Sequence, residues 1–268
     1  MFPLSGKNFP TSADDLAAAI QESLEEVLTF PKKTAVVKIT GDDFPALKSL
    51  KVDLSGAAVN PDNPPPAPKP KGKRTPGITV ATLDVTGHPI LYEKSKADLD
   101  VKAKGLTFDF AHDAKGNALL VLTDAKDGSV NVKIAKDDLR AALLAAASAA
   151  AKTQGVTIQE LDINLNADGP RALAADVRVK AKKMMMSGVV NVRGRADIDD
   201  NLVATLSDLA CTGEGMIGNM AAGFLQGKLK SYDGKKIPLM TFSLGDVTLQ
   251  DLKVTTKPQI QLSATFGS

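Results

Sequence analysis

The sequence predicts an α+β fold in which a long, strongly bent, largely antiparallel sheet, shaped as an incomplete barrel, wraps around two or three helices. Three observations predict it. Apolar and polar residues alternate with period two through much of the 268 residues, three stretches have helical spacing, and several predicted strands lose their alternation once. A chain of this length can bury one large core, so we expect a single domain at residues 1–268.

The first predicted element is an amphipathic helix in TSADDLAAAIQESLEEVLTF, which ends near Phe30 and Pro31. Ser12 and Asp15 have the spacing of a capping pair at its start. The apolar residues that follow recur at helical spacing and are Leu16, Ile20, Leu24, Val27 and Leu28. We therefore expect one face of this helix to pack against the sheet.

Alternation then predicts strands at residues 34–40, 47–59, 78–85 and 97–110. Between the second and the third lies PDNPPPAPKPKGKRTPG, residues 61–77, whose prolines and basic residues favour an extended, solvated loop inserted in the domain. In most loops of this kind the basic residues serve only to keep the loop solvated. Contact of the basic residues with anions or lipid headgroups is the less common alternative. Residues 117–134 predict a hairpin with Asp127 and Gly128 at its turn.

The second predicted helix, from Asp137 to Gln154, carries no charged side chain between Ala141 and Ala151. A helix without a polar face has to be covered by other apolar surface, and a curled sheet could wrap around it. Close packing of alanine against the strands would leave a dry core. The alternative is a lengthwise apolar groove, lined by this helix and the next one. Its candidate residues are Leu139, Leu143, Leu144, Ala146, Ala150, Met216, Met220 and Phe224.

A second run of strands is predicted after this helix. Alternating stretches lie at residues 156–166, 171–183, 188–198, 201–211, 238–256 and 258–268. The apolar set changes from odd to even positions after Gly105, and the same slip occurs within residues 158–161, 206–209 and 249–252. Bulges in long, bent strands produce such slips and increase the local twist, so we expect a strongly curled sheet.

A third helix is predicted from Gly213 to Leu229, where apolar residues return to helical spacing. Glycines in this stretch lower its helix propensity. Close packing of the helix on the sheet is the more common reason for such glycines, and mobility at a ligand entrance is the alternative. Its methionines suit an irregular apolar ligand because their side chains adapt in shape, although methionine in an ordinary core is more common.

The predicted strand at residues 171–183 has one basic face and leads into three consecutive methionines. One interpretation is an ordinary solvent-facing strand whose methionines fold back over the core. The other is transient contact with a membrane, in which the methionines insert shallowly and the cations face anionic headgroups. The candidate membrane-contact residues are Arg178, Lys180, Lys182, Met184, Met185 and Met186.

The sequence offers no recognisable catalytic, cofactor or metal site. His88 and His112 are the only histidines and lie in dissimilar contexts, and Cys211 has no histidine near it in the sequence. Neither a nucleophile elbow nor a phosphate-binding loop is present. A net charge of +2 does not favour nucleic acid. We therefore expect a protein that is not an enzyme and that uses no cofactor, metal ion or nucleic acid.

The order of elements resembles the LmeA-like phospholipid-binding proteins of bacteria and, more broadly, the tubular lipid-binding (TULIP) superfamily. The segments that carry the resemblance lie in order within residues 13–266 and are VKIAKDDLRAALLAAA, VTIQELDINLN, ADVRVKAKK, MTFSLGDVTLQDLKVTT and PQIQLSATFG. The resemblance implies a TULIP-like fold and a phospholipid ligand. It also implies a bacterial periplasmic or envelope location if a signal segment has been removed, and a cytoplasmic one otherwise.

These observations predict non-catalytic binding, and as one use of it transport, of a lipid or fatty-acid-like molecule in the groove between helix and curved sheet. The alternative is a structural or interaction protein of the cell envelope with a dry core. A continuous apolar cavity would favour the first function, and close packing throughout would favour the second. The sequence leaves the oligomeric state open.

Overall fold

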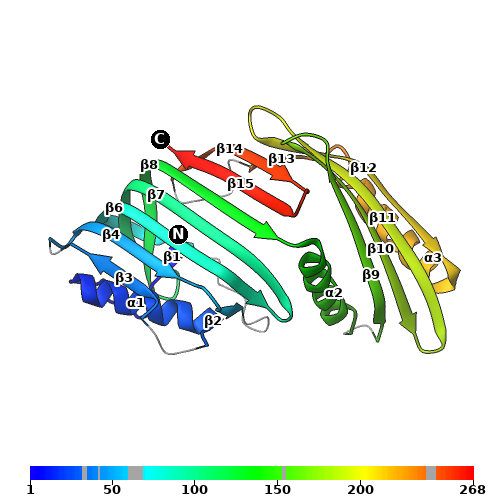
Figure 1. The fold of residues 1–268 in the computed structure, drawn as a ribbon, viewed down its shortest axis with the longest axis horizontal. Coiled ribbons are helices and arrows are strands. Elements are labelled where there is room, and N and C mark those ends of the chain that lie inside the picture. Colours follow the sequence, from blue (N-terminus) through cyan, green and yellow to red (C-terminus); the bar gives the residue numbers. More distant parts are fainter. Residues whose placement is uncertain (32–34, 42, 60–68, 153–154, 240–245) are drawn as a thin grey trace.

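The alternating segments form two curved sheets, which helix α2 (Lys136–Lys152) connects (Figure 1). The computed structural model describes residues 1–31, 35–41, 43–59, 69–152, 155–239 and 246–268. Within these residues both sheets are open and largely antiparallel, so the predicted α+β class is confirmed. The strands divide between two sheets, however, where the sequence predicted one.

The first sheet contains strands from both ends of the chain. Its strand order is β14-β15-β8-β7-β6-β4-β3, and the short strands β1, β2 and β5 lie beside this path. Strand β6 pairs in parallel with β4 and with β5, and antiparallel with β7. The bounds are β1 Phe2–Pro3, β2 Leu28–Thr29, β3 Val37–Thr40, β4 Ala46–Asp53, β5 Ala58–Val59, β6 Lys71–Tyr92, β7 Ser95–His112, β8 Ala118–Ile134, β14 Thr248–Thr255 and β15 Ile260–Gly267.

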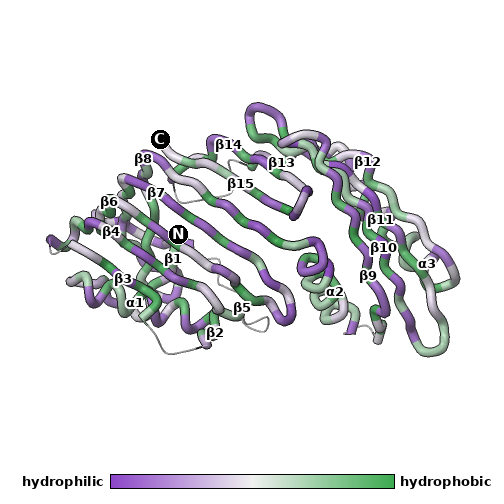
Figure 2. The backbone as a smooth tube through the Cα atoms, in the orientation of Figure 1, coloured by the Kyte–Doolittle hydropathy of each residue, from purple (hydrophilic) through white to green (hydrophobic). Residues whose placement is uncertain are grey.

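The second sheet is antiparallel throughout and follows the order β13-β12-β11-β10-β9. Its bounds are β9 Thr157–Ala167, β10 Ala172–Lys183, β11 Met186–Ile198, β12 Val203–Glu214 and β13 Lys236–Pro238. Figure 2 shows apolar and polar residues alternating along the long strands of both sheets.

Register shifts occur where the sequence predicted bulges. The pairing shifts once within residues 158–160 of β9, 207–210 of β12 and 249–251 of β14. At Gly105 the change of face coincides with a positive φ of 59°, while the pairing on either side of it stays in register. These irregularities change which face a side chain occupies without ending the strand.

Helix α1 (Ala13–Val27) packs on the first sheet and completes the main core. The Ser12 hydroxyl accepts a hydrogen bond from the Asp15 backbone N–H, which confirms the predicted cap. The helix ends three residues before the predicted point at Phe30, because Leu28 and Thr29 pair with β5. Its buried side chains meet those of the sheet, and the shared core includes Leu16, Ile20, Leu24, Leu47, Val80, Leu106, Phe110 and Leu120.

The hairpin predicted at residues 117–134 is wrong, because the whole stretch forms one strand, β8. Asp127 and Gly128 lie in mid-strand, opposite Lys104 and Ala103 of β7. Gly128 pairs with Phe266 of β15, and a Cβ atom at this glycine would clash with the Phe266 ring. The glycine is therefore explained by a cross-strand aromatic contact and not by a turn.

The loop predicted at residues 61–77 is only partly described. Residues 61–68 lie outside the described residues, and residues 71–77 belong to strand β6, so the predicted loop is too long at its C-terminal end. Pro76 is accommodated inside this strand at an irregular part of its pairing with β7, where the register shifts between Pro76 and Ile78. A proline removes one backbone donor, which an irregular pairing tolerates.

Helix α2 is not wrapped by a sheet. It lies between the two sheets and packs against β7 and β9 (Figure 1). None of its residues, all of which are described, is fully buried. The expectation that a curled sheet covers this helix is therefore wrong, because the strands before and after it belong to different sheets and neither continues around it.

The two sheets also meet where β14 reaches the turn between β9 and β10. The Val254 backbone N–H donates to the Pro170 carbonyl oxygen at 2.8 Å. The Arg171 guanidinium donates to Asp251 of β14 at 2.8 Å and to Asp200 at 2.7 Å. Lys253 and Arg171 together lower the pKa of Asp251 to about 2. This junction therefore depends on a charged Asp251.

We predict that Asp251→Asn lowers the free energy of unfolding by about 1 kcal/mol near neutral pH. The folded-state pKa of about 2 lies below the ordinary value of 3.8, so the stabilisation is complete above pH 4 and is lost as the pH falls towards 2. Urea unfolding at neutral pH and at pH 3 should show the difference between variant and wild type narrowing. A difference independent of pH would contradict this. Asp200→Asn is the control, since its fully exposed side chain should contribute little.

Candidate functional site

Helix α3 (Gly215–Lys230) lies on one face of the second sheet, against β11 and β12. Glycines bring the backbones of helix and sheet into direct contact. A Cβ atom at Gly218 would clash with the carbonyl oxygen of Val189, and one at Gly188 or Gly213 would clash with the backbone of Gly218. Close packing is thus confirmed as the reason for Gly218.

This contact divides the apolar residues of α3 into two groups. Ile217 and Ala222 are buried against the sheet, with 8% and 7% of their surface exposed. Met216, Met220 and Phe224 recur at every fourth position on the other side and are 69%, 69% and 67% exposed. These three residues, called the α3 stripe below, therefore do not line a groove against the sheet.

The predicted groove between helix and curved sheet, lined by residues of the second and third helices, is not formed. On α2, Leu139, Leu143 and Leu144 are half-buried, while Ala146 and Ala150 are exposed. Helix α2 packs on β7 and β9, whereas α3 packs mainly on β11 and β12. The two helices lie against different strands, and the α3 stripe faces away from the sheet, so the structure does not bring the two halves of the groove together.

An apolar cavity lies instead on the face of the second sheet that carries α3. Register places Ala181 opposite Gly188, whose missing side chain points at α3, so Ala175, Val177 and Val179 lie on this face as well. Beyond the helix the face is only half-buried. A cavity of about 260 Å³ opens there, called the apolar trough below, and is lined by Leu173, Ala175, Val177, Val192, Arg193, Gly194, Arg195, Ala196, Leu206 and Leu209.

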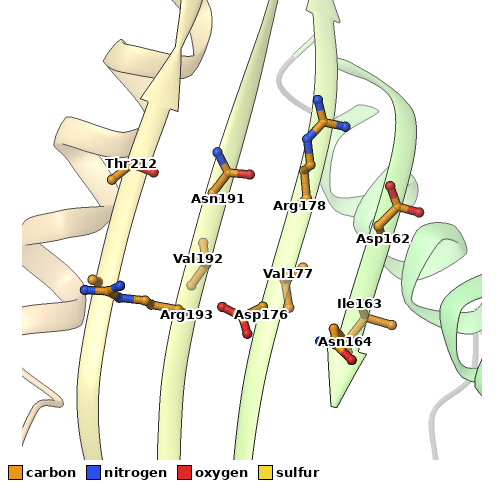
Figure 3. A pocket seen from close by; sticks show the side chains of 11 residues that line it. Asp162, Ile163, Asn164, Asp176, Val177, Arg178, Asn191, Val192, Arg193 and Thr212 are labelled. Carbon is orange, nitrogen blue, oxygen red and sulfur yellow. The ribbon is translucent and has the colours of Figure 1, made fainter. Parts of the chain in front are cut away.

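The opposite face of the same sheet is polar and holds a cavity of about 540 Å³ (Figure 3). The register places its side chains in two rows across the four long strands. One row consists of Asp162, Arg178, Asn191 and Thr212, which Figure 3 shows side by side, and the other of Asn164, Asp176, Arg193 and Ala210.

Charges in the two rows oppose each other on neighbouring strands. Arg178 lies opposite Asp162, and Arg193 lies opposite Asp176. Arg140 of α2 adds a cation 3.6 Å from the Asp162 carboxylate. Opposite charges directly across a strand pair stabilise a sheet, which explains the rows without a ligand. Among the described residues no cluster of three or more His, Cys, Asp or Glu side chains could hold a metal ion.

The candidate membrane-contact residues divide between this cavity and the tip of the β10–β11 hairpin. Arg178 lines the polar cavity, and Lys180 and Lys182 continue along the same face towards the tip, both exposed. Met184, Met185 and Met186 are 84%, 96% and 42% exposed. The interpretation in which these methionines fold back over the core is therefore wrong.

The histidines and the cysteine do not form a common site. The His88 ring lies 2.8 Å from Asp100, and His112 Nε2 lies 2.9 Å from the Lys7 carbonyl oxygen. Cys211 is half-buried on β12, and burial raises the pKa of its thiol. A raised pKa leaves less of the reactive thiolate near neutral pH. The three side chains therefore offer no assembled nucleophile and base.

The sequence marked three residues of the apolar trough without assigning them a role. Leu173, Ala175 and Val177 already formed one apolar face of a predicted strand. What could not be foreseen is that α3 would cover only part of that face. The available signal was an apolar strand face with too few predicted helices to cover it.

Comparisons with known proteins leave the family of the chain open. No protein-family model, no curated protein and no solved structure matches it. The likeness to LmeA-like proteins therefore remains a prediction from the order of elements. Among the described residues, no helix combines the length and the apolar composition needed to cross a membrane.

We predict that Gly218→Ala destabilises the protein by about 1–3 kcal/mol, because the new methyl group meets the backbone of β11 and the helix has to move away. Gly223→Ala is the matched control in the same helix. A Cβ atom there would meet nothing within 4 Å, so the substitution should be neutral or stabilise the helix by up to about 1 kcal/mol. Thermal unfolding of both variants tests this, and equal effects would contradict the close contact.

Proposed function

We propose that the protein binds a lipid or another long apolar molecule, without catalysing a reaction, on the apolar face of the second sheet. The observation that carries the proposal is the apolar trough, which lies beside α3 and opens to solvent. Aliphatic side chains form most of its wall, and the register places the Arg193 and Arg195 side chains on the opposite, polar face of the sheet. This lining suits a hydrocarbon chain.

Burial of hydrocarbon supplies the driving force. Leu173, Leu206 and Leu209 are only half-buried in the protein alone. Covering apolar surface gives roughly 25 cal/mol per Å², so a ligand chain that covers these residues gains affinity without a specific polar contact. Such a site selects for shape and length more than for chemical identity.

The first sheet offers a second stretch of incompletely covered apolar surface. Beyond the α1 core, Val132 and Ile134 of β8 pair with Leu262 and Ile260 of β15. Leu262 is 40% exposed and the others are half-buried. A TULIP-like arrangement, in which one long ligand contacts both sheets, is the more specific form of the proposal.

The alternative is a structural or interaction protein with a dry core. The core around α1 fits that function, since Leu16, Ile78 and Leu106 are almost completely buried. The open trough favours ligand binding, because a protein selected only for packing has no need of an uncovered apolar sheet face. Oligomeric state enters neither argument.

Lipid extraction tests the function directly. The purified protein should carry a long-chain lipid or fatty acid that mass spectrometry of an organic extract detects above a control protein of similar size. Refilling the delipidated protein with a fluorescent fatty acid should then give saturable binding. Absence of both an extracted lipid and saturable uptake would favour the structural alternative.

We predict that Ala175→Phe weakens binding of the fluorescent fatty acid at least tenfold, because the ring occupies part of a cavity of about 260 Å³. A loss of about 1.4 kcal/mol suffices for that factor. The matched control is Ala146→Phe, the same substitution at an exposed residue of α2. Equal affinity of both variants would show that the probe binds elsewhere.

A further inference from the structure

The methionines of the β10–β11 hairpin and of α3 meet at one corner of the second sheet. The hairpin turns at Met184 and Met185, and Met186 begins β11. A Cβ atom at Gly215, the first residue of α3, would lie 3.0 Å from the carbonyl oxygen of Ser187. Met186 and Met216 each adjoin one of these two contacting residues. The hairpin tip therefore lies beside the start of α3, and the exposed apolar side chains of the tip and of the α3 stripe are together called the methionine corner below.

This corner is apolar and exposed to an extent that packing does not explain. Five of its six large side chains are more than 60% exposed, and the sixth, Met186, is 42% exposed. The α3 stripe alone extends about 12 Å along the helix axis at 1.5 Å per residue. A group of exposed, large apolar side chains in one part of a protein marks an interaction surface.

Positive charge surrounds the methionine corner. Residues 177–190 and 215–230, which build it, contain no Asp or Glu, and their basic residues are Arg178, Lys180, Lys182, Lys183, Lys228 and Lys230. Lys228 Nζ lies 4.6 Å from the centroid of the Phe224 ring. Across the strand pairs, Arg178 lies opposite Asp162 and Lys180 opposite Glu160. Lys182 and Lys183 at the tip lie opposite Thr157, Ser187 and Met186, none of which is acidic. The corner thus combines flexible apolar side chains with two cations, Lys182 and Lys183, that face no carboxylate across the strand pairs.

We propose that the methionine corner docks the protein onto an anionic lipid membrane. The methionines and Phe224 would enter the interface, and the lysines would contact headgroups, each contributing about 1 kcal/mol near such a surface. A second copy of the chain fits the corner less well, because symmetrical contact would place like charges against each other. The proposal does not depend on the apolar trough. Vesicle binding without fatty-acid uptake would contradict the proposed function and support docking. Fatty-acid uptake without vesicle binding would contradict docking and support the proposed function.

A single introduced tryptophan tests insertion, since the chain has none of its own. Phe224→Trp should shift its fluorescence emission to the blue when vesicles of equal parts phosphatidylcholine and phosphatidylglycerol are added, and should not with phosphatidylcholine alone. Ala18→Trp, at an exposed residue of α1 on the first sheet, is the control and should show no shift. A shift of equal size in both variants, or in neither, overturns the proposal.

Vesicle sedimentation tests the charges. The double variant Lys182→Ala, Lys183→Ala should lower the partition coefficient onto the anionic vesicles roughly 30-fold, and raising the salt should weaken wild-type binding. Lys102→Ala, Lys104→Ala on the first sheet is the control and should bind as wild type. Equal losses of vesicle binding in both double variants overturn the proposal. It is also overturned if substitution of Phe224 abolishes self-association of the protein but leaves vesicle binding unchanged.

Discussion

Helix α3 can approach the second sheet only because Gly188, Gly213 and Gly218 carry no side chains at the contact. The helix therefore lies with its backbone against β11 and β12 and needs few large residues to bury itself. Ile217 and Ala222 face the sheet, which frees the other apolar positions to face outwards. Both surfaces that we connect with function, the apolar trough beside α3 and the methionine corner, follow from this one close contact.

The two sheets differ in how completely their apolar faces are covered. The first covers its apolar face with α1 and forms the main core of the molecule, in which Leu16 is completely buried. Within the described residues, the helix that packs on the apolar face of the second sheet is α3, and side chains such as Leu173 and Leu209 remain half-exposed. A closed core is rigid. Apolar side chains on an open face stay in contact with water and add less to the stability of the fold, and a bound molecule that covers them would increase that stability.

Alternation places opposite chemistry on the two faces of β10. Val177 belongs to the apolar trough, while Asp176 and Arg178 lie among the polar rows of the other face. Because each carboxylate in those rows lies opposite a guanidinium, the larger polar cavity carries little net charge and is explained as an ordinary solvated sheet face. By size alone, the polar cavity would be the candidate site. The chemistry of the lining favours the smaller, apolar cavity.

Local pattern was sufficient for much of this fold. The cap at Ser12, the three helices and the bulges at 158–161, 206–209 and 249–252 depend on near neighbours in the chain, and the sequence predicted each of them. Contacts between distant residues decided the rest. Gly128 predicted a turn from the local sequence, but a glycine is needed there because the ring of Phe266, 138 positions later in the chain, packs against it. The alanine helix and the α3 stripe gave an apolar spacing but no partner, since periodicity defines a face and only tertiary packing decides what covers it.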